Sequence, residues 1–340
     1  MQFDPQLHIQ LQQTLDLIKS KILASLDKPF LIRKSFEYGE TFLSDKSILQ
    51  LAKSLRADEP RSALSSTDDY WNLEHARWYA VKNFLELPYT DFLPGRIHTY
   101  RLFAKHIATL TDSNSAVDVG CGSGMMLHEL NRIGIRADGI DNSVEALHLA
   151  KAIAESEYEY SPKLVCSDAL KLGALLPDNR YDIVTNLGSL EHLPFKKQIQ
   201  FVTYMTSLTR KYIAICIPNK SSYFFNTMED SELSLSDNKL VYPEEFDQHI
   251  VEFDLLRKEL GGKLVGRVGI HCIPTSITAT KAIEKQFGIQ FNPPRKSCVS
   301  YLQRLEHAEK FERSLQHQLV VKQGWFYCEI WDMEHHSLAS

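Results

Sequence analysis

The sequence lacks three features that would place it at once in a large class of proteins. No apolar stretch approaches the roughly 20 residues that a membrane-spanning helix needs. No sign of charge dominates, because 38 Lys and Arg residues face 43 Asp and Glu residues and leave a formal net charge of −5. Cysteine pairs at C-x-x-C spacing are missing. A membrane protein, a strongly basic nucleic-acid-binding protein and a zinc-ribbon protein are therefore all disfavoured.

The cysteines are few and scattered, and the first residues do not resemble an export signal. No basic segment followed by an apolar one opens the chain, as a signal peptide would require. We therefore expect reduced, mostly buried thiols and a cytoplasmic location. The six cysteines have no metal-ligand spacing and lie at positions 121, 166, 216, 272, 298 and 328.

The most informative segment is residues 116–124, which read Ala-Val-Asp-Val-Gly-Cys-Gly-Ser-Gly. An apolar run containing Asp118 ends in glycines at alternate positions, and an amphipathic helical pattern follows from residue 125. Glycine permits positive φ and lets a ligand approach the main chain, while a helix start offers free N–H groups. A dinucleotide-binding turn needs G-x-G-x-x-G, whose last glycine would fall on Met125. The spacing therefore predicts a strand, turn and helix that bind a different ligand.

Alternating strand and helix patterns continue along the chain and predict an α/β fold. We expect a Rossmann-like, seven-stranded, mostly parallel sheet with helices on both faces. The strands are expected near residues 116–119, 135–140, 163–166, 182–185, 212–217, 263–270 and 325–331. The helices are expected near residues 97–110, 125–133, 143–154, 195–208 and 242–260, with an amphipathic stretch at 301–322.

Polar residues follow the ends of successive predicted strands, where parallel sheets bind their ligands. Asp141 follows the second strand, Asp168 the third and Asn186 the fourth. Each acid also has a structural alternative. Asp141 or Ser143 could cap the next helix, Asp168 could belong to an exposed turn, and Asp118 could orient the glycine turn.

These positions, taken in order, resemble the motifs of the class I S-adenosylmethionine (SAM) methyltransferases over about residues 98–220. The resemblance implies SAM as cofactor, with its methionine end at the glycine turn, its ribose at Asp141 and its adenine at Asp168 and Ala169. It implies a helical N-terminal extension or lid at residues 1–96 and a methyltransferase domain at 97–333. Residues 271–323, an insertion and a late helix, are expected on the substrate side. The implied cofactor contacts are Asp118, Gly120, Cys121, Gly122, Gly124, Asp141, Asn142, Asp168, Ala169, Asn186 and Leu187.

The step Ser-Leu-Glu-His-Leu-Pro at residues 189–194 resembles the one after strand four in small-molecule methyltransferases, including the type 11 and ubiquinone-biosynthesis O-methyltransferase groups. His192 could be a general base, since the ordinary histidine pKa lies near working pH. Glu191 and His192 could instead brace the site or contact the amino end of SAM. Members with Glu-x-x-Glu-His bind a divalent metal. Here Gly188 replaces the first Glu, so no metal is expected.

An aromatic helix is predicted upstream of the glycine turn, at about residues 68–87. Trp71 and Trp78 are seven residues apart and share a helical face, which favours core packing. Tyr70, Arg77 and Tyr79 are candidates for a lid over the cofactor or substrate. Arg77 could pair there with the carboxylate of SAM.

The resemblance implies a SAM-dependent methyltransferase that transfers a methyl group to O or N of a small or medium-sized metabolite. One alternative acceptor is RNA or protein, which the balanced charge disfavours. Residues 186–189 read Asn-Leu-Gly-Ser instead of the Asn/Asp-Pro-Pro-Tyr of enzymes that methylate nucleic-acid amino groups. The other alternative is a non-catalytic regulatory protein of the same fold, which the retained glycines and Asp141 oppose. The acceptor and the oligomeric state are left open.

Overall fold

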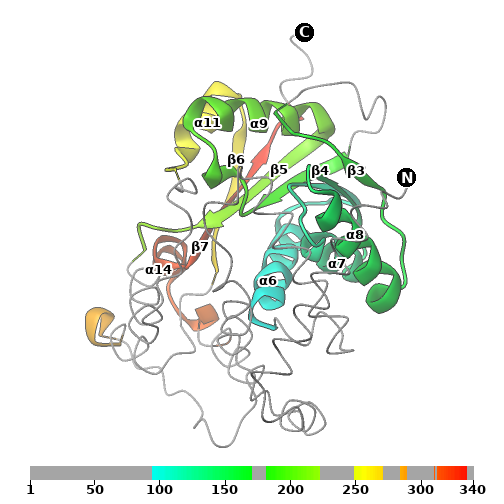
Figure 1. Ribbon diagram of the computed structural model, residues 1–340. Helices are drawn as coiled ribbons and strands as arrows, with labels where there is room; N and C mark the ends of the chain where they lie inside the picture. Colours follow the sequence, from blue (N-terminus) through cyan, green and yellow to red (C-terminus); the bar gives the residue numbers. More distant parts are fainter. Residues whose placement is uncertain are drawn as a thin grey trace, which may run out of the picture.

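The computed structural model describes residues 94–170, 181–222, 249–270, 284–288, 310 and 312–334 (Figure 1). Its centre is one seven-stranded sheet in the order β3-β2-β1-β4-β5-β7-β6. The strands are β1 Ser115–Val119, β2 Arg136–Asp141, β3 Leu164–Cys166, β4 Tyr181–Leu187, β5 Thr209–Pro218, β6 Lys263–Ile270 and β7 Phe326–Asp332. The candidate lid residues Tyr70, Arg77 and Tyr79, and the tryptophans Trp71 and Trp78, lie outside the described residues.

The strand directions confirm the predicted mostly parallel, Rossmann-like α/β sheet. Strands β3, β2, β1, β4 and β5 pair in parallel, and only β7 runs antiparallel to its two neighbours. The chain moves outward from β1 to β3 and then returns to place β4 beside β1. This reversal creates a crevice at the carboxyl ends of β1 and β4, the place where open α/β sheets bind ligands.

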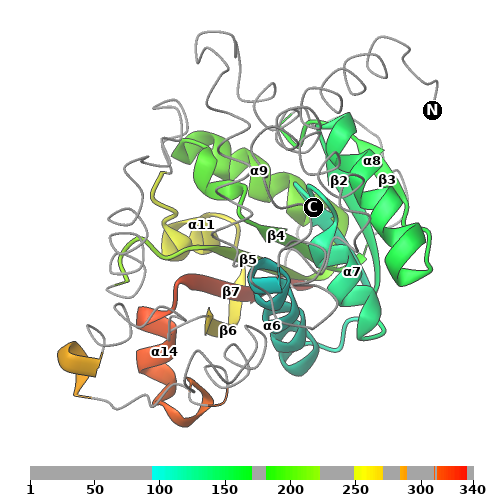
Figure 2. The same cartoon turned by 60° about the horizontal axis from the view of Figure 1, so that its bottom comes forward.

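Helices cover both faces of the sheet and bury two apolar cores (Figure 2). On one face, α6 and α7 bring in Phe103, Ile107 and Leu130, all fully buried. On the other face, α9 and α11 contribute Met205 and Leu256. The helices are α6 Pro94–Leu110, α7 Met125–Arg132, α8 Val144–Ile153, α9 Phe195–Leu208, α11 Phe253–Glu259 and α14 His317–Gln323, with a π-helical turn η2 Ala154–Tyr158 and a 3₁₀ turn η3 Leu190–His192.

Two predicted helices are shorter than their sequence patterns indicated. The helix expected at residues 242–260 begins only at Phe253, and residues 249–252 are not helical. Their backbone is held by tertiary hydrogen bonds instead, because His249 N donates to Glu191 O and Gln198 Nε2 donates to Ile250 O. Residues 242–248 lie outside the described part.

The amphipathic stretch at 301–322 is not one helix either. Gln316 has extended backbone angles and interrupts it, so α14 starts at His317. The break lets α14 lie directly on β6, where a Cβ added to Gly269 would meet Val320 O. At the other end of the fold, α6 begins at Pro94, inside the segment expected to form the N-terminal extension. Among the described residues, no helix is long and apolar enough to cross a membrane.

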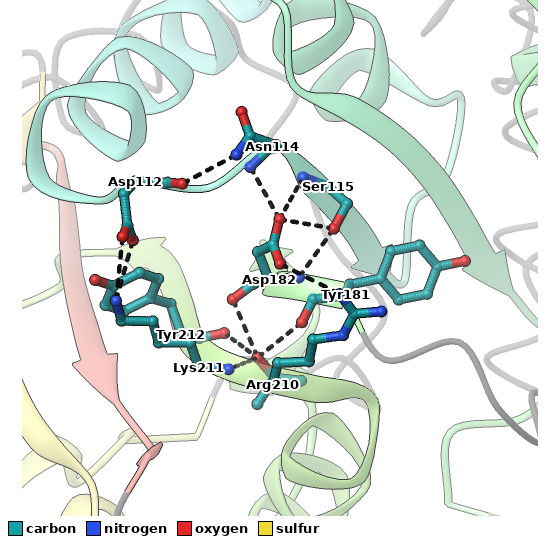
Figure 3. Close-up of polar contacts among 9 residues, drawn as sticks. Asp112, Asn114, Ser115, Tyr181, Asp182, Arg210, Lys211 and Tyr212 are labelled. Carbon is teal, nitrogen blue, oxygen red and sulfur yellow. Dashed lines mark hydrogen bonds and ion pairs between the residues drawn. The ribbon is translucent and has the colours of Figure 1, made fainter.

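A polar network ties together the amino ends of β1, β4 and β5 (Figure 3). One oxygen of Asp182 accepts hydrogen bonds from Asn114 N, Ser115 N and Ser115 Oγ at 2.9–3.0 Å. Lys211 Nζ lies 3.2 Å from Asp112 Oδ2 beside them. These contacts fix where the strands begin, so the polar residues at this end serve the fold. The candidate functional site is therefore sought at the carboxyl ends of the same strands.

Candidate active site

The three alternate glycines adopt the backbone conformation that their spacing predicted. Gly120, Gly122 and Gly124 have φ of 74°, 51° and 77°, a region that other residues rarely enter. The turn is pinned to the neighbouring strand, because Gly120 N and Cys121 N both donate to Ile140 O at 2.8 and 3.1 Å. Gly124 then stands at the N-cap position of α7. The turn therefore presents main chain and a helix start at the carboxyl ends of β1 and β2.

Close packing leaves no room for a side chain at Gly120 or Gly124. A Cβ on Gly120 would lie 2.4 Å from Ser189 Oγ, and one on Gly124 would lie 3.0 Å from His128 Nε2. His128 is fully buried on α7, with Nδ1 3.0 Å from Tyr160 Oη and its ring stacked on Tyr158. Burial lowers the pKa of His128 to about 3, so a neutral ring supports the turn. Sequence reasoning did not identify this support.

Asp141 is the last residue of β2 and directly contacts the glycine turn. Its Oδ2 accepts from Gly122 N at 2.8 Å, and its Oδ1 accepts from Ser143 N at 2.9 Å. The cap of α8 is Ser143, whose hydroxyl accepts from Ala146 N at 3.1 Å. Ser143 therefore fills the capping role that the sequence left open. Each carboxylate oxygen can accept two hydrogen bonds and accepts one here, so Asp141 keeps acceptor capacity for a ligand diol.

Asp118 lies beneath the turn and joins two central strands. It is 2% exposed, and its Oδ1 accepts from Thr185 Oγ1 on β4 at 2.7 Å. Burial raises the pKa of Asp118 to about 7, the hydrogen bond from Thr185 lowers it, and the charge of Asp141 raises it. This hydrogen bond joins β1 to β4 and does not reach the glycine turn, so both roles of Asp118 stay predictions.

The remaining candidates on the adenine side occupy turns after β2 and β3. Asp168 Oδ1 accepts from Leu170 N at 2.8 Å, the turn geometry that the sequence also allowed, and Ala169 packs against the core beside α9. Asn142 is exposed. Cys121, in the glycine turn, is buried. Burial is the main cause that raises the pKa of its thiol, and the charges of Asp141 and Asp118 raise it further.

Asn186 connects the two strands at the crevice. It is fully buried, its Nδ2 donates to Val119 O at 2.7 Å, and its Oδ1 accepts from Leu190 N at 3.3 Å. The amide thus fastens the end of β1 to η3. Leu187, half-buried at the end of β4, lies next to it. Asn186 positions the elements around the crevice through these backbone contacts.

Glu191 and His192 stand on η3 at the far side of the crevice. Glu191 is 3% exposed, and its Oε2 has no hydrogen-bond partner among the described residues. Burial raises the pKa of Glu191 to about 7, while its own backbone and Lys220 lower it. His192 Nε2 lies 3.9 Å from Glu191 Oε1. Burial, Lys220 and His249 lower the pKa of His192, so its imidazole is neutral near pH 7 and able to accept a proton.

A cavity of about 330 Å³ opens beside Glu191, past the carboxyl end of β5. Sequence reasoning missed most of its wall. Lys220 follows the end of the fifth strand, a position that the strand-end rule could have flagged, whereas nothing in the sequence marked His249. The wall of the cavity includes Glu191, Ile217, Lys220, Val251, Phe253, Lys322 and Tyr327. In the described part of the chain, no group of three or more His, Cys, Asp or Glu residues is arranged to hold a metal ion.

Comparison with known protein families identifies the domain that contains the glycine turn. Residues 116–211 match the family described as "Methyltransferase domain". The chain carries a class I SAM-dependent methyltransferase domain. The matched part of this methyltransferase domain runs from β1 into β5 and contains the turn, Asp141, Asn186 and η3.

The methyltransferase domain has curated relatives named ubiquinone biosynthesis O-methyltransferase. The protein of that name from Nitrosococcus oceani is 33% identical over 124 residues, which are 36% of this chain and 49% of the relative. The one from Burkholderia multivorans is 35% identical over 124 residues, with the same shares. The chain therefore spans about half the length of these curated relatives.

Solved methyltransferase structures also resemble the chain. One is magnesium protoporphyrin IX methyltransferase of Synechocystis with bound S-adenosylhomocysteine (SAH), at 21% identity and a TM-score of 0.43, covering 60% of this chain and 90% of that one. Another is a SAM-dependent methyltransferase of Archaeoglobus fulgidus, at 16% identity and a TM-score of 0.41, covering 68% and 94%.

Proposed function

We propose that this protein is a cytoplasmic SAM-dependent methyltransferase that transfers a methyl group to O or N of a small or medium-sized metabolite. The observation that carries the proposal is the glycine turn. Its three glycines, at alternate positions, all have positive φ, and the carboxylate of Asp141 accepts a hydrogen bond from the middle one, Gly122. The turn stands at the crevice between β1 and β4, where this sheet topology binds ligands.

The residues around the turn fit the parts of SAM. Positive φ and the absence of a side chain at Gly120 and Gly122 suit the amino-acid end, because they let a ligand approach the main chain closely. Asp141 suits the ribose diol, since a carboxylate accepts from two hydroxyl groups. Asp168 and Ala169 suit the adenine. Asp118 and Asn186 are buried positioning residues: Asp118 joins β1 to β4, and Asn186 holds Val119, the residue before the turn.

SAM supplies an electrophilic methyl group, so the protein mainly aligns the acceptor and excludes water. The acceptor O or N would take the methyl carbon from SAM held at the glycine turn and Asp141, and the electron pair of the broken carbon–sulfur bond would go to sulfur. A neutral His192 receives the proton that the acceptor loses. The lowered pKa of His192 keeps it in this form at neutral pH.

A small acceptor is favoured over RNA or protein by the size of the cavity beside Glu191. Its 330 Å³ lies at the low end of the 300–1,000 Å³ that is usual for small-molecule sites, roughly the room that a metabolite needs. The name of the curated relatives favours oxygen as the methylated atom. A non-catalytic role is opposed by the intact glycine turn.

Calorimetric titration with SAM, and with NAD as the unrelated nucleotide, tests the proposal. Asp141→Ala should weaken SAM binding about tenfold to a hundredfold, because hydrogen bonds to a charged group contribute about 1.5–3 kcal/mol. Asp112→Ala removes an exposed carboxylate at the opposite ends of the strands and is the matched control. Absence of SAM binding by the folded wild-type protein, or equal SAM affinity in both variants, refutes the assignment.

A further inference from the structure

The geometry points to the cavity beside Glu191 as the acceptor site, and to an acceptor that carries an anionic group on an apolar body. This inference rests on the proposed function and adds the chemical class of the acceptor.

The cavity adjoins the glycine turn through a short chain of contacts. Gly120 packs against Ser189, which precedes Glu191 by two residues. Glu191 Oε1 would lie 3.7 Å from a Cβ on Gly188, so its carboxyl folds back over the turn that follows β4. Glu191 also lines the cavity. A molecule in the cavity therefore has its inner end beside the crevice in which the methyl donor is proposed to bind.

The side walls of the cavity are apolar. Ile217 and Val251 are each 8% exposed, and Phe253 packs edge-to-face on Tyr327 with ring centroids 5.1 Å apart. Such a wall suits a flat or branched hydrocarbon body, and aromatic rings add favourable contacts for an aromatic one. The polar members of the wall, Asn219, Ser221 and His249, complete the lining beside these apolar side chains.

Charge divides the cavity into an inner and an outer end. At the inner end, the carboxyl of Glu191 is buried and one of its oxygens has no hydrogen-bond partner among the described residues. At the outer end, Lys220 and Lys322 are exposed and line the cavity. The charge of Lys220 also reaches the inner end, where it acts to lower the pKa values of Glu191 and His192. A buried acceptor oxygen without a donor is costly, so it calls for a hydroxyl or amino group of the ligand. Two ammonium groups at the mouth attract and pair with an anion.

These ends orient the acceptor. Its acidic group stays at the lysines, its body lies along Phe253 and Tyr327, and its hydroxyl or amino group faces Glu191. The raised pKa of Glu191 is consistent with such a neutral, poorly solvated position. A cationic acceptor of the same shape would be repelled by the lysines at the mouth.

Binding to the SAH-loaded protein tests the inference without turnover. The ligands share a hydroxyphenyl body: 4-hydroxyphenylacetate, 4-hydroxybenzylphosphonate, methyl 4-hydroxyphenylacetate and tyramine. At least one of the two anions should bind at least tenfold more tightly than the neutral ester, and tyramine should bind less than the ester. The tighter anion identifies the acid as a carboxylate or a phosphonate-like group.

Variants that remove one positive charge show which residues cause the preference for an anionic ligand. Lys220→Gln and Lys322→Gln should each weaken anion binding up to about fivefold and leave the ester unchanged, the effect of one exposed ion pair. Lys163→Gln, on an exposed residue at the start of β3, should change nothing. The inference is overturned if neither anion binds, if anion and ester bind equally, or if both lysine variants match wild type. SAH binding is measured in every sample, and its absence would instead refute the proposed function.

Discussion

Two aspartates at opposite ends of the sheet are expected to change stability with opposite pH dependence. Asp118 lies under the glycine turn, and burial raises its pKa to about 7. Asp182 stands at the amino ends of the strands. Burial acts to raise the pKa of Asp182, but hydrogen bonds from Asn114 and Ser115 outweigh it, so the pKa is lowered. Replacing each by Asn removes the titration while keeping the shape of the side chain.

The size of the Asp118 effect follows from its pKa. A carboxyl whose pKa rises on folding stabilises the fold below its unfolded value of 3.8, and this contribution is lost as pH rises through about 7. At 1.36 kcal/mol per pKa unit, the shift corresponds to about 4 kcal/mol at most. The stability of Asp118→Asn relative to wild type should therefore increase by up to about 4 kcal/mol between pH 4 and pH 8.

Asp182→Asn should behave in the opposite way. A lowered pKa stabilises the fold above the unfolded value and is lost as pH falls through the folded one. The variant should thus be less stable than wild type at pH 7 and approach it below pH 4.

Urea unfolding from pH 3 to pH 8 at constant ionic strength, followed by tryptophan fluorescence, measures both differences. A pH-independent difference for Asp118→Asn would contradict the reasoning, as would the same slope in both variants.

Three further substitutions test other parts of the structure. Gly120→Ala should unfold at a lower temperature than Gly134→Ala, because both have positive φ but only Gly120 has neighbours within 4 Å; thermal unfolding of the two variants decides. Glu329→Gln should lower the free energy of unfolding by about 3 kcal/mol, since the buried carboxylate accepts from Arg257, Tyr327 and Trp331 at 2.6–2.7 Å, and unchanged urea unfolding would contradict this. His192→Gln should slow SAH formation, and wild-type activity should persist below pH 6.5; equal rates for both proteins across pH would remove His192 as the base.

The sheet and the glycine turn were predictable from the sequence because both depend on local requirements. Parallel strands buried on both faces read as apolar runs, and the helices between them have their own periodicity. Positive φ at Gly120, Gly122 and Gly124 needs glycine whatever surrounds it. These sequence patterns can be recognised without knowledge of tertiary contacts.

The rest depended on contacts between distant segments. Residues 249–252 fit a helical pattern, yet their backbone bonds to Glu191 and Gln198 instead of forming a helical turn. The cavity combines residues from η3, the end of β5, the segment that leads into α11, the first residue of α11, α14 and β7. No single stretch of sequence contains such a wall, so neither Lys322 nor Tyr327 could be recognised in advance.

Asp141 shows how a local pattern and a tertiary contact combine in one residue. The sequence offered two roles for it, a ribose contact and a helix cap, and Ser143 takes the cap. Asp141 instead accepts from Gly122 N, which places a fixed negative charge against the turn before any ligand arrives. Because that bond leaves acceptor capacity on the carboxylate, the same group is able to hold the turn and a ribose together. Loss of Asp141 should then weaken the methionine end of the SAM site as well as the ribose end, a coupling that SAM and adenosine titrations of Asp141→Ala would separate.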